Sequence, residues 1–265
     1  QPAAATKQLT MEAGASAVVT VQAFVPKDQD SGKLEIGKFK AQFGTSSASK
    51  PVYLHTKSMV EIKDLDVQVA NEEARNVANG DKISKEPHPG ETIEFNFLVK
   101  NTFTSQQDID LENIELTVRL VDIDGGDDLE QTSEFDLQAS DSQTETIGFV
   151  IPFDVEEEEY TVEIEVTGED DNGAQHTTNW TLKLPVEKLR DAIIILKAEF
   201  SPTVVTCEES IPLLIRFKNI GTRTQQNVRY TISAPRLNFN VEKDGILLDR
   251  SITKKENEYS ETLTV

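Results

Sequence analysis

The sequence repeats itself with a period of about 118 residues, and this repeat limits the possible folds more than any other feature. Two alternating runs, 93–101 and 211–219, both end in Lys-Asn, and a second alternating run follows each of them. Such a period is typical of an array of structural units in which each unit packs against its neighbours. The matched positions are Ile93, Phe95, Phe97, Val99, Lys100 and Asn101 with Ile211, Leu213, Ile215, Phe217, Lys218 and Asn219, then Asn113, Ile114, Leu116 and Val118 with Asn227, Val228, Tyr230 and Ile232.

A second internal match joins the start of the chain to its middle, so the repeats are out of phase with the ends. It aligns Met11, Ala13, Thr20, Val25 and Pro26 with Leu137, Ala139, Thr146, Ile151 and Pro152. We therefore predict the late-strand half of one unit over 1–57, a complete unit over 59–187 and the early-strand portion of a third unit over 190–265.

Alternation with a period of two residues dominates the chain, and we find no convincing helical period. Within Thr161–Val166, apolar residues point one way and glutamates the other, which is typical of an antiparallel sandwich. With about seven short strands per unit, we predict an all-β chain of tandem immunoglobulin-like β-sandwiches. The predicted strands are Ala17–Val25, Lys33–Phe43, Val52–Thr56, Val60–Val69, Thr92–Lys100, Asn113–Val121, Thr144–Ile151, Tyr160–Thr167, Thr178–Leu184, Ala192–Phe200, Ile211–Lys218, Asn227–Ala234 and Tyr259–Val265.

The net charge of the chain limits the kinds of molecule that it can bind. A formal net charge of -21 argues against nucleic acid, which needs a basic face, and favours attraction of cations. Cys207 is the single cysteine, so no disulfide forms within the chain, and we interpret it as a small half-buried side chain rather than a nucleophile. No run of eighteen apolar residues is present, so we predict no membrane span here. Because the chain opens with Gln1, we expect a processed or truncated protein.

Several longer stretches carry a family resemblance. The run His88–Asn101, with its Pro-Gly-Glu opening, resembles CARDB-type archaeal surface sandwiches. Residues 108–118, 122–130 and 160–176 are similar to S-layer proteins of small-genome, woesearchaeal-type archaea. The resemblance is strongest over 59–234, and the second copy departs from it with Cys207-Glu-Glu-Ser in place of Pro-Gly-Glu. It implies a secreted, extracellular, multi-domain protein of the cell surface without enzymatic activity, and it supplies no catalytic residues.

One acidic loop is the best candidate for a metal site. It contains Asp122, Asp124, Asp127, Asp128 and Glu130 around two glycines. Calcium prefers six to eight oxygen ligands, which such a loop offers, but the EF-hand pattern fails because Gly126 stands at the third ligand position. We favour a solvated acidic loop and keep a Ca²⁺ site as the alternative. No other cofactor is expected.

The remaining motifs point away from catalysis. His55, His88 and His176 are scattered without the spacing of metal ligands, and no nucleotide-binding or serine-hydrolase motif is present. A single Trp makes the aromatic wall of a glycosidase cleft hard to build. We therefore predict that the chain is not an enzyme. Asn179-Trp180-Thr181 is an N-glycosylation sequon on an accessible strand position, although such sequons are also common by chance.

These observations support three functional hypotheses. The first is a structural S-layer or envelope-filament protein that binds copies of itself, other envelope proteins or glycans. The second is an extracellular adhesin or carbohydrate-binding stalk, and the third is an accessory segment of a larger secreted enzyme. The half-units at both ends would expose strand edges and apolar faces. We expect the chain to continue in both directions, and strand exchange between chains is the alternative.

Overall fold

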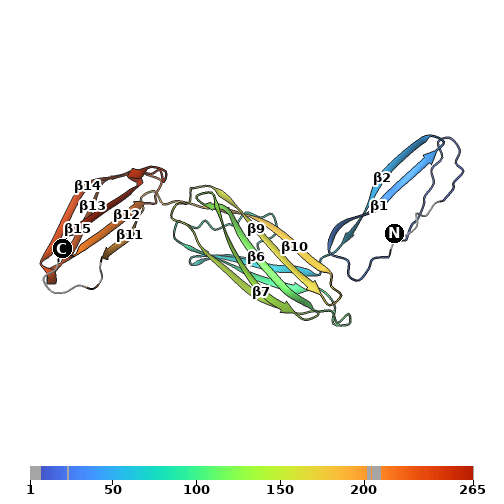
Figure 1. Cartoon of the computed structure of the whole chain (residues 1–265), viewed down its shortest axis with the longest axis horizontal. Coiled ribbons are helices and arrows are strands. Elements are labelled where there is room, and N and C mark those ends of the chain that lie inside the picture. Colours follow the sequence, from blue (N-terminus) through green and yellow to red (C-terminus); the bar gives the residue numbers. More distant parts are fainter. Residues whose placement is uncertain (1–6, 23, 202–203, 205–209, 265) are drawn as a thin grey trace.

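The chain folds into antiparallel β-structure in three successive units. The computed structural model describes residues 7–22, 24–201, 204 and 210–264, and no α-helix occurs among them. Figure 1 shows the units following one another along the long axis, with the amino-terminal and carboxy-terminal units on opposite sides of the middle unit. The predicted all-β, antiparallel sandwich architecture is confirmed. Within the described ranges, no helix has the length and apolar character needed to cross a membrane.

The middle unit is a sandwich of two four-stranded sheets. One sheet has the order β4-β3-β5-β8 and the other the order β10-β9-β6-β7, and neighbouring strands are antiparallel throughout. The strands are β3 (Val60–Val69), β4 (Glu72–Ala74), β5 (Thr92–Asn101), β6 (Leu111–Asp124), β7 (Asp127–Leu137), β8 (Ser142–Val150), β9 (Glu159–Asp170) and β10 (Gln175–Pro185).

Strict alternation builds the core of this unit. On β9 the side chains of Val162, Ile164 and Val166 are buried while the glutamates between them face solvent. Phe95 and Phe97 on β5 are fully buried, and their ring planes are nearly parallel, at 21°, with centroids 6.3 Å apart. Burial of a side chain of this size contributes about 1.5–3 kcal/mol, so a core of this extent holds the two sheets together.

The carboxy-terminal unit repeats five strands of the middle unit in the same order. Its sheets are β11-β12-β15 and β13-β14, which correspond to β3-β5-β8 and β6-β7. Ile62 lies opposite Val99 and Ile195 opposite Phe217, and a bulge follows each of these pairs. In the described residues this unit has no counterpart of β9 and β10. Its elements are β11 (Ile193–Phe200), β12 (Pro212–Asn219), β13 (Gln225–Ala234), β14 (Phe239–Leu248), β15 (Glu258–Thr264) and the 3₁₀ turns η1 (Pro235–Leu237) and η2 (Lys255–Asn257).

The amino-terminal unit is a single hairpin of β1 (Gly32–Phe43) and β2 (Ser46–Thr56). Its strands have 12 and 11 residues, the same lengths as β9 and β10. The expected strand Ala17–Val25 is wrong: its described residues form no strand, and Val18 is 94% exposed. This segment matches β8, which pairs with β5, and none of the described residues before it forms a β5-like strand that could supply the hydrogen bonds.

Three strands of the structure were not predicted from the sequence. The strand β7 lacks an apolar alternation because it lies at a sheet edge and most of its residues are exposed. The short strand β4 and most of β14 are likewise too polar or too short to show a period of two. Edge strands face solvent on more than one side, so their composition carries little signal.

Direct hydrogen bonds connect the hairpin to the middle unit. The backbone N–H of Ser31 donates to the Gln175 carbonyl over 2.7 Å, and the Gln175 N–H donates to Asp30 Oδ1 over 2.8 Å. On the other side of the middle unit, Lys218 Nζ pairs with Asp154 Oδ1. Each terminal unit is therefore joined to the middle unit by polar contacts as well as by the chain.

Candidate functional site

The acidic loop predicted as a cation site is the tight turn between β6 and β7. Gly125 and Gly126 form the turn with φ values of 63° and 100°, a backbone conformation that glycine adopts without strain. Asp124 and Asp127 face each other across it. Asp128 Oδ1 accepts a hydrogen bond of 2.8 Å from the backbone N–H of Asp122, which itself has a positive φ.

Arginine neutralises part of this loop. Arg119 Nε donates to Glu130 Oε2 over 2.8 Å, and Nη1 lies 3.5 Å from Glu163 Oε2. Two of the five predicted ligands are thus used within the protein: Asp128 holds the turn and Glu130 binds Arg119. Among the residues that the structure describes, no three His, Cys, Asp or Glu side chains are grouped so that they could hold a metal ion. The calcium site stays a prediction.

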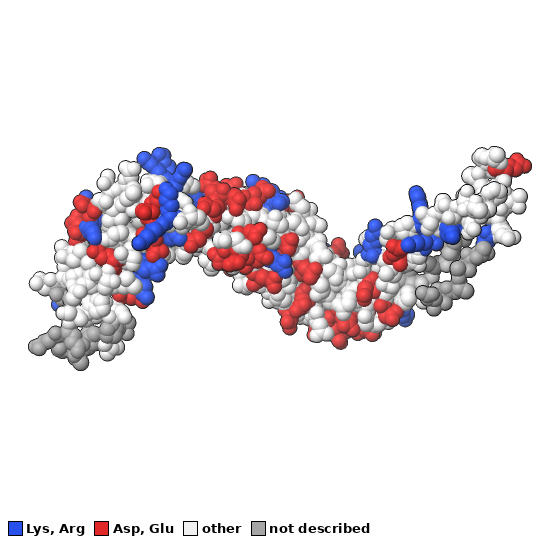
Figure 2. Space-filling view, turned by 45° about the horizontal axis from the view of Figure 1, so that its top comes forward, with Lys and Arg blue, Asp and Glu red and all other residues white. Residues whose placement is uncertain are grey.

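Negative charge is concentrated on the middle unit. Residues 58–187 contain 33 of the 47 acidic residues but only 7 of the 26 Lys and Arg residues. Figure 2 shows carboxylates spread over this unit, with lysines and arginines gathered toward its two ends. Sequence reasoning used the total charge and missed this division along the chain, which a count over each predicted unit would have revealed. A surface of this kind attracts cations and repels copies of itself.

The predicted glycosylation site lies on the outer face of the β10-β9-β6-β7 sheet. Asn179 is exposed and stands opposite Glu165 on β9. Trp180, the single Trp, is half-buried against the core, as expected from its alternation. Asn179, Trp180, Arg119 and Glu163 contribute to a shallow hollow of about 310 Å³. The site is thus accessible to modification, and its glycosylation stays a prediction.

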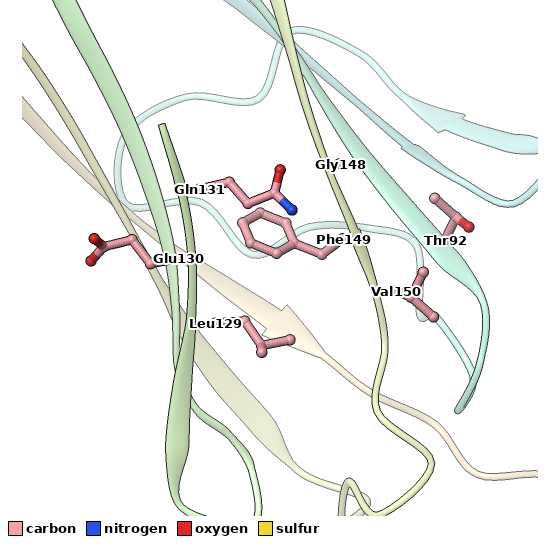
Figure 3. Close-up of a pocket in the computed structure, with 7 residues that line it drawn as sticks. All are labelled: Thr92, Leu129, Glu130, Gln131, Gly148, Phe149 and Val150. Carbon is pink, nitrogen blue, oxygen red and sulfur yellow. The ribbon is translucent and has the colours of Figure 1, made fainter. Parts of the chain in front are cut away.

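A second hollow, of about 470 Å³, opens between β7, an edge strand of one sheet, and β8, an edge strand of the other. It is lined by β7 and β8 together with Thr92 of β5, and Figure 3 shows the Phe149 ring pointing between the two strands. That ring is almost fully buried and lies edge-on to Phe95, with centroids 6.2 Å apart. The hollow has mainly apolar walls and one carboxylate, Glu130, at its rim.

Two of the three histidines, His88 and His176, have side-chain partners in the middle unit. His176 is buried, with Nε2 3.3 Å from Asp170 Oδ2, while its Nδ1 accepts a hydrogen bond from the Met59 backbone N–H. Burial raises the pKa of Asp170, but hydrogen bonds from the Ala174 and Asn172 amides and from His176 lower it by more than burial raises it. The pKa of Asp170 therefore lies below its ordinary value. His88 pairs with Glu91 over 3.1 Å, His55 lies on β2, and Cys207 falls outside the described residues.

The carboxy-terminal unit has an open apolar face, a feature that the sequence predicted for a half-unit without naming the residues. Ile195 is 71% exposed, whereas its counterpart Ile62 in the middle unit is 3% exposed. Ile193 is 43% exposed against 1% for its counterpart Val60. In the middle unit β9 and β10 cover this face of β3, and the carboxy-terminal unit lacks such strands among the described residues. The strongest candidate for a binding site is therefore this apolar face of the carboxy-terminal unit, because none of its described strands covers it.

The comparisons with known proteins do not place the chain in a family. No family model and no curated protein matches it. Two solved structures are similar over 77% of the chain at 10% sequence identity: a red sea bream transglutaminase, with a TM-score of 0.26, and the sporulation control protein Spo0M of Bacillus subtilis, with a TM-score of 0.24. The matched region covers 27% of the transglutaminase chain and 91% of the Spo0M chain. At these scores the similarities carry no argument about activity.

Proposed function

We propose that this chain is a non-catalytic structural protein of the cell surface, an S-layer or envelope-filament subunit built from tandem immunoglobulin-like sandwiches. The observation that carries the proposal is the repetition of one sandwich design along the chain. The middle and carboxy-terminal units share strand order, and the pairs β3–β5 and β11–β12 share their register and the position of their bulge. The units follow one another in a line (Figure 1). Repeated units in a line are suited to spanning distance and to presenting the same contacts at regular intervals.

The charge distribution supports an extracellular, cation-dependent assembly. The middle units of neighbouring copies repel each other through their carboxylates unless cations lie between them. Calcium binds carboxylate oxygens from more than one chain as readily as from one loop. The turn with Asp122, Asp124 and Asp127 projects such oxygens into solvent at the end of the β6–β7 hairpin. Calcium would act in this proposal as a bridge between subunits.

Electron microscopy of the purified chain tests the proposal. We expect ordered filaments or sheets in calcium that dissolve when a chelator is added and form again when calcium is restored. A variant with Asp124→Asn and Asp127→Asn should need more calcium for the same assembly, whereas Glu72→Gln, at an exposed site on β4, should not. Particles that never order in any calcium concentration contradict the structural role.

A carbohydrate-binding stalk is the second candidate, and the hollow beside Trp180 favours it. An aromatic ring flanked by Arg119, Glu163 and Glu165 offers both stacking and hydrogen bonding to a sugar. A glycan array with the whole chain distinguishes the two functions. Specific retention that is lost in Trp180→Ala and kept in Asn179→Gln would support the stalk, and absence of binding to any glycan would leave the structural role as the better account.

A further inference from the structure

We infer that the carboxy-terminal unit is an acceptor for a β-hairpin, and that β1–β2 of a second copy of this chain is the hairpin it accepts. This inference rests on the proposed assembling role and names the contact that would produce it. The middle unit shows what the completed structure looks like, because it contains five strands that match β11–β15 and also the hairpin β9–β10, which has no counterpart among the described residues of the carboxy-terminal unit.

The acceptor has a free strand edge. In the middle unit β6 pairs with β7 on one side and with β9 on the other. Its counterpart β13 pairs with β14, and in the described part of the chain no strand occupies its other edge. Unpaired backbone N–H and C=O groups along Asn227–Ala234 are thus available for the antiparallel ladder that β6 makes with β9.

The acceptor also has an uncovered apolar face. Ile193 and Ile195 on β11 occupy the positions of Val60 and Ile62, which β9 and β10 cover in the middle unit. Across from them, Val228 and Tyr230 on β13 are only half-buried, whereas the matching β6 residues are fully buried. Covering these side chains removes apolar surface from water, which is the main driving force for strand addition.

The hairpin offers a matching apolar face. The register of β1 with β2 places Leu34 opposite Leu54 and Phe39 opposite Lys50, so Leu34, Phe39 and Phe43 share one side with Val52 and Leu54. In the free hairpin Phe39 is 55% exposed and Phe43 is 90% exposed. The opposite side carries mostly polar side chains, including Lys38, Lys40 and Glu35. This is the division found on β9, where valines and isoleucine face the core and glutamates face water.

The shape of the chain directs the hairpin to another molecule. The hairpin and the acceptor lie at opposite ends of the long axis with the whole middle sandwich between them (Figure 1). The hairpin of one chain therefore does not reach the acceptor of the same chain. A hairpin that binds the next chain leaves its own acceptor free, and this head-to-tail contact adds chains without closing. The expected product is a filament in which every junction contains a complete sandwich.

Two substitutions test the contact. Phe39→Asp places a charge on the apolar side of the hairpin, and Ile195→Asp places one on the acceptor. Both residues are largely exposed in the free chain, so neither change should prevent folding. By light scattering in the presence of calcium, we expect the particle mass of the unmodified chain to grow with concentration, and each variant alone to stay at the mass of one chain, 29.5 kDa. Tyr53→Asp, on the polar side of the hairpin, is the matched control and should still assemble.

Mixing the two variants gives the decisive result. The Phe39→Asp chain keeps a working acceptor and the Ile195→Asp chain keeps a working hairpin, so an equal mixture should form particles of twice the single mass and none larger. Assembly that persists in both variants overturns the hairpin contact while leaving the proposed structural role. An unmodified chain that stays single at all concentrations also overturns it and assigns the acceptor to another occupant, such as further strands of a longer polypeptide. Hairpin-dependent oligomers that never order into filaments or layers would support the contact and count against the proposed function.

Discussion

Asn101 and Asn219 are fully buried at equivalent positions of two sandwich units and make equivalent hydrogen bonds. Asn101 Nδ2 donates to the carbonyls of Ile109 and Leu137, and Asn219 Nδ2 donates to those of Arg223 and Leu248. Each Oδ1 accepts the backbone N–H two residues later, over 2.9 Å. Each amide thus connects the end of a strand in one sheet to the end of a strand in the other.

Replacing this amide should loosen the unit that contains it. For Asn101→Ala we expect a loss of about 1–3 kcal/mol in the free energy of unfolding of the middle unit, because buried carbonyls and an N–H lose their partners. Fluorescence in urea measures it directly, since Trp180 is the single Trp and lies in that unit. Asn179→Ala, at an exposed site, is the control, and equal effects of the two changes would contradict the assigned role.

Gly221 should not accept a larger side chain. A Cβ atom there would lie 2.8 Å from the Ala192 backbone N and 2.9 Å from the Leu189 carbonyl oxygen, and backbone does not move aside easily. We expect Gly221→Ala to destabilise the carboxy-terminal unit by about 1–3 kcal/mol through overpacking. Hydrogen exchange over β12 measures the loss. Gly245→Ala meets no neighbour within 4 Å and carries only the strain of a positive φ, so it should cost less.

Glu261 should make the carboxy-terminal unit sensitive to acid. Hydrogen bonds from Tyr230, Tyr259 and Lys243 lower the pKa of Glu261 to about 2. Because the folded pKa is lower than the unfolded value of 4.5, this stabilisation is present above that value and is lost as the pH falls toward 2. Hydrogen exchange of β15 across this range should show the loss in the natural chain. This loss of protection should be smaller in Glu261→Gln and unchanged in Glu256→Gln. Identical pH profiles for the natural chain and Glu261→Gln would contradict the prediction.

Asp170 should stabilise the β9–β10 turn through its charge. Its Oδ1 accepts the N–H groups of Asn172 and Ala174, and its Oδ2 faces His176. In Asp170→Asn one oxygen acceptor becomes a donor, so we expect a loss of about 1–3 kcal/mol at neutral pH. Because the folded pKa is depressed below 3.8, the difference between the two proteins should shrink as the pH falls below that value. Trp180 fluorescence reports it, and Glu165→Gln, on the exposed side of β9, is the control.

The sequence by itself determined the fold class, most strands and the repeat. Alternation with a period of two predicted Val60–Val69 with the same bounds that the structure has, because one face of β3 is buried and the other is wet. The repeated Lys-Asn predicted two equivalent strand ends, which Asn101 and Asn219 now explain. The polar edge strand β7 was missed and a strand was wrongly predicted at 17–25, where the described residues form none, since strand formation at both places depends on a neighbouring strand rather than on the residues themselves.

Only the tertiary structure decided which carboxylates have partners within the protein and which apolar faces are covered. It showed that Asp128 and Glu130 are occupied by the Asp122 amide and by Arg119, which no pattern of carboxylates reveals. It also showed that Ile195 is exposed where Ile62 is buried, although both stand in the same apolar phase. The physical reason is that alternation specifies which side of a strand is apolar, whereas burial requires a second sheet to cover that side.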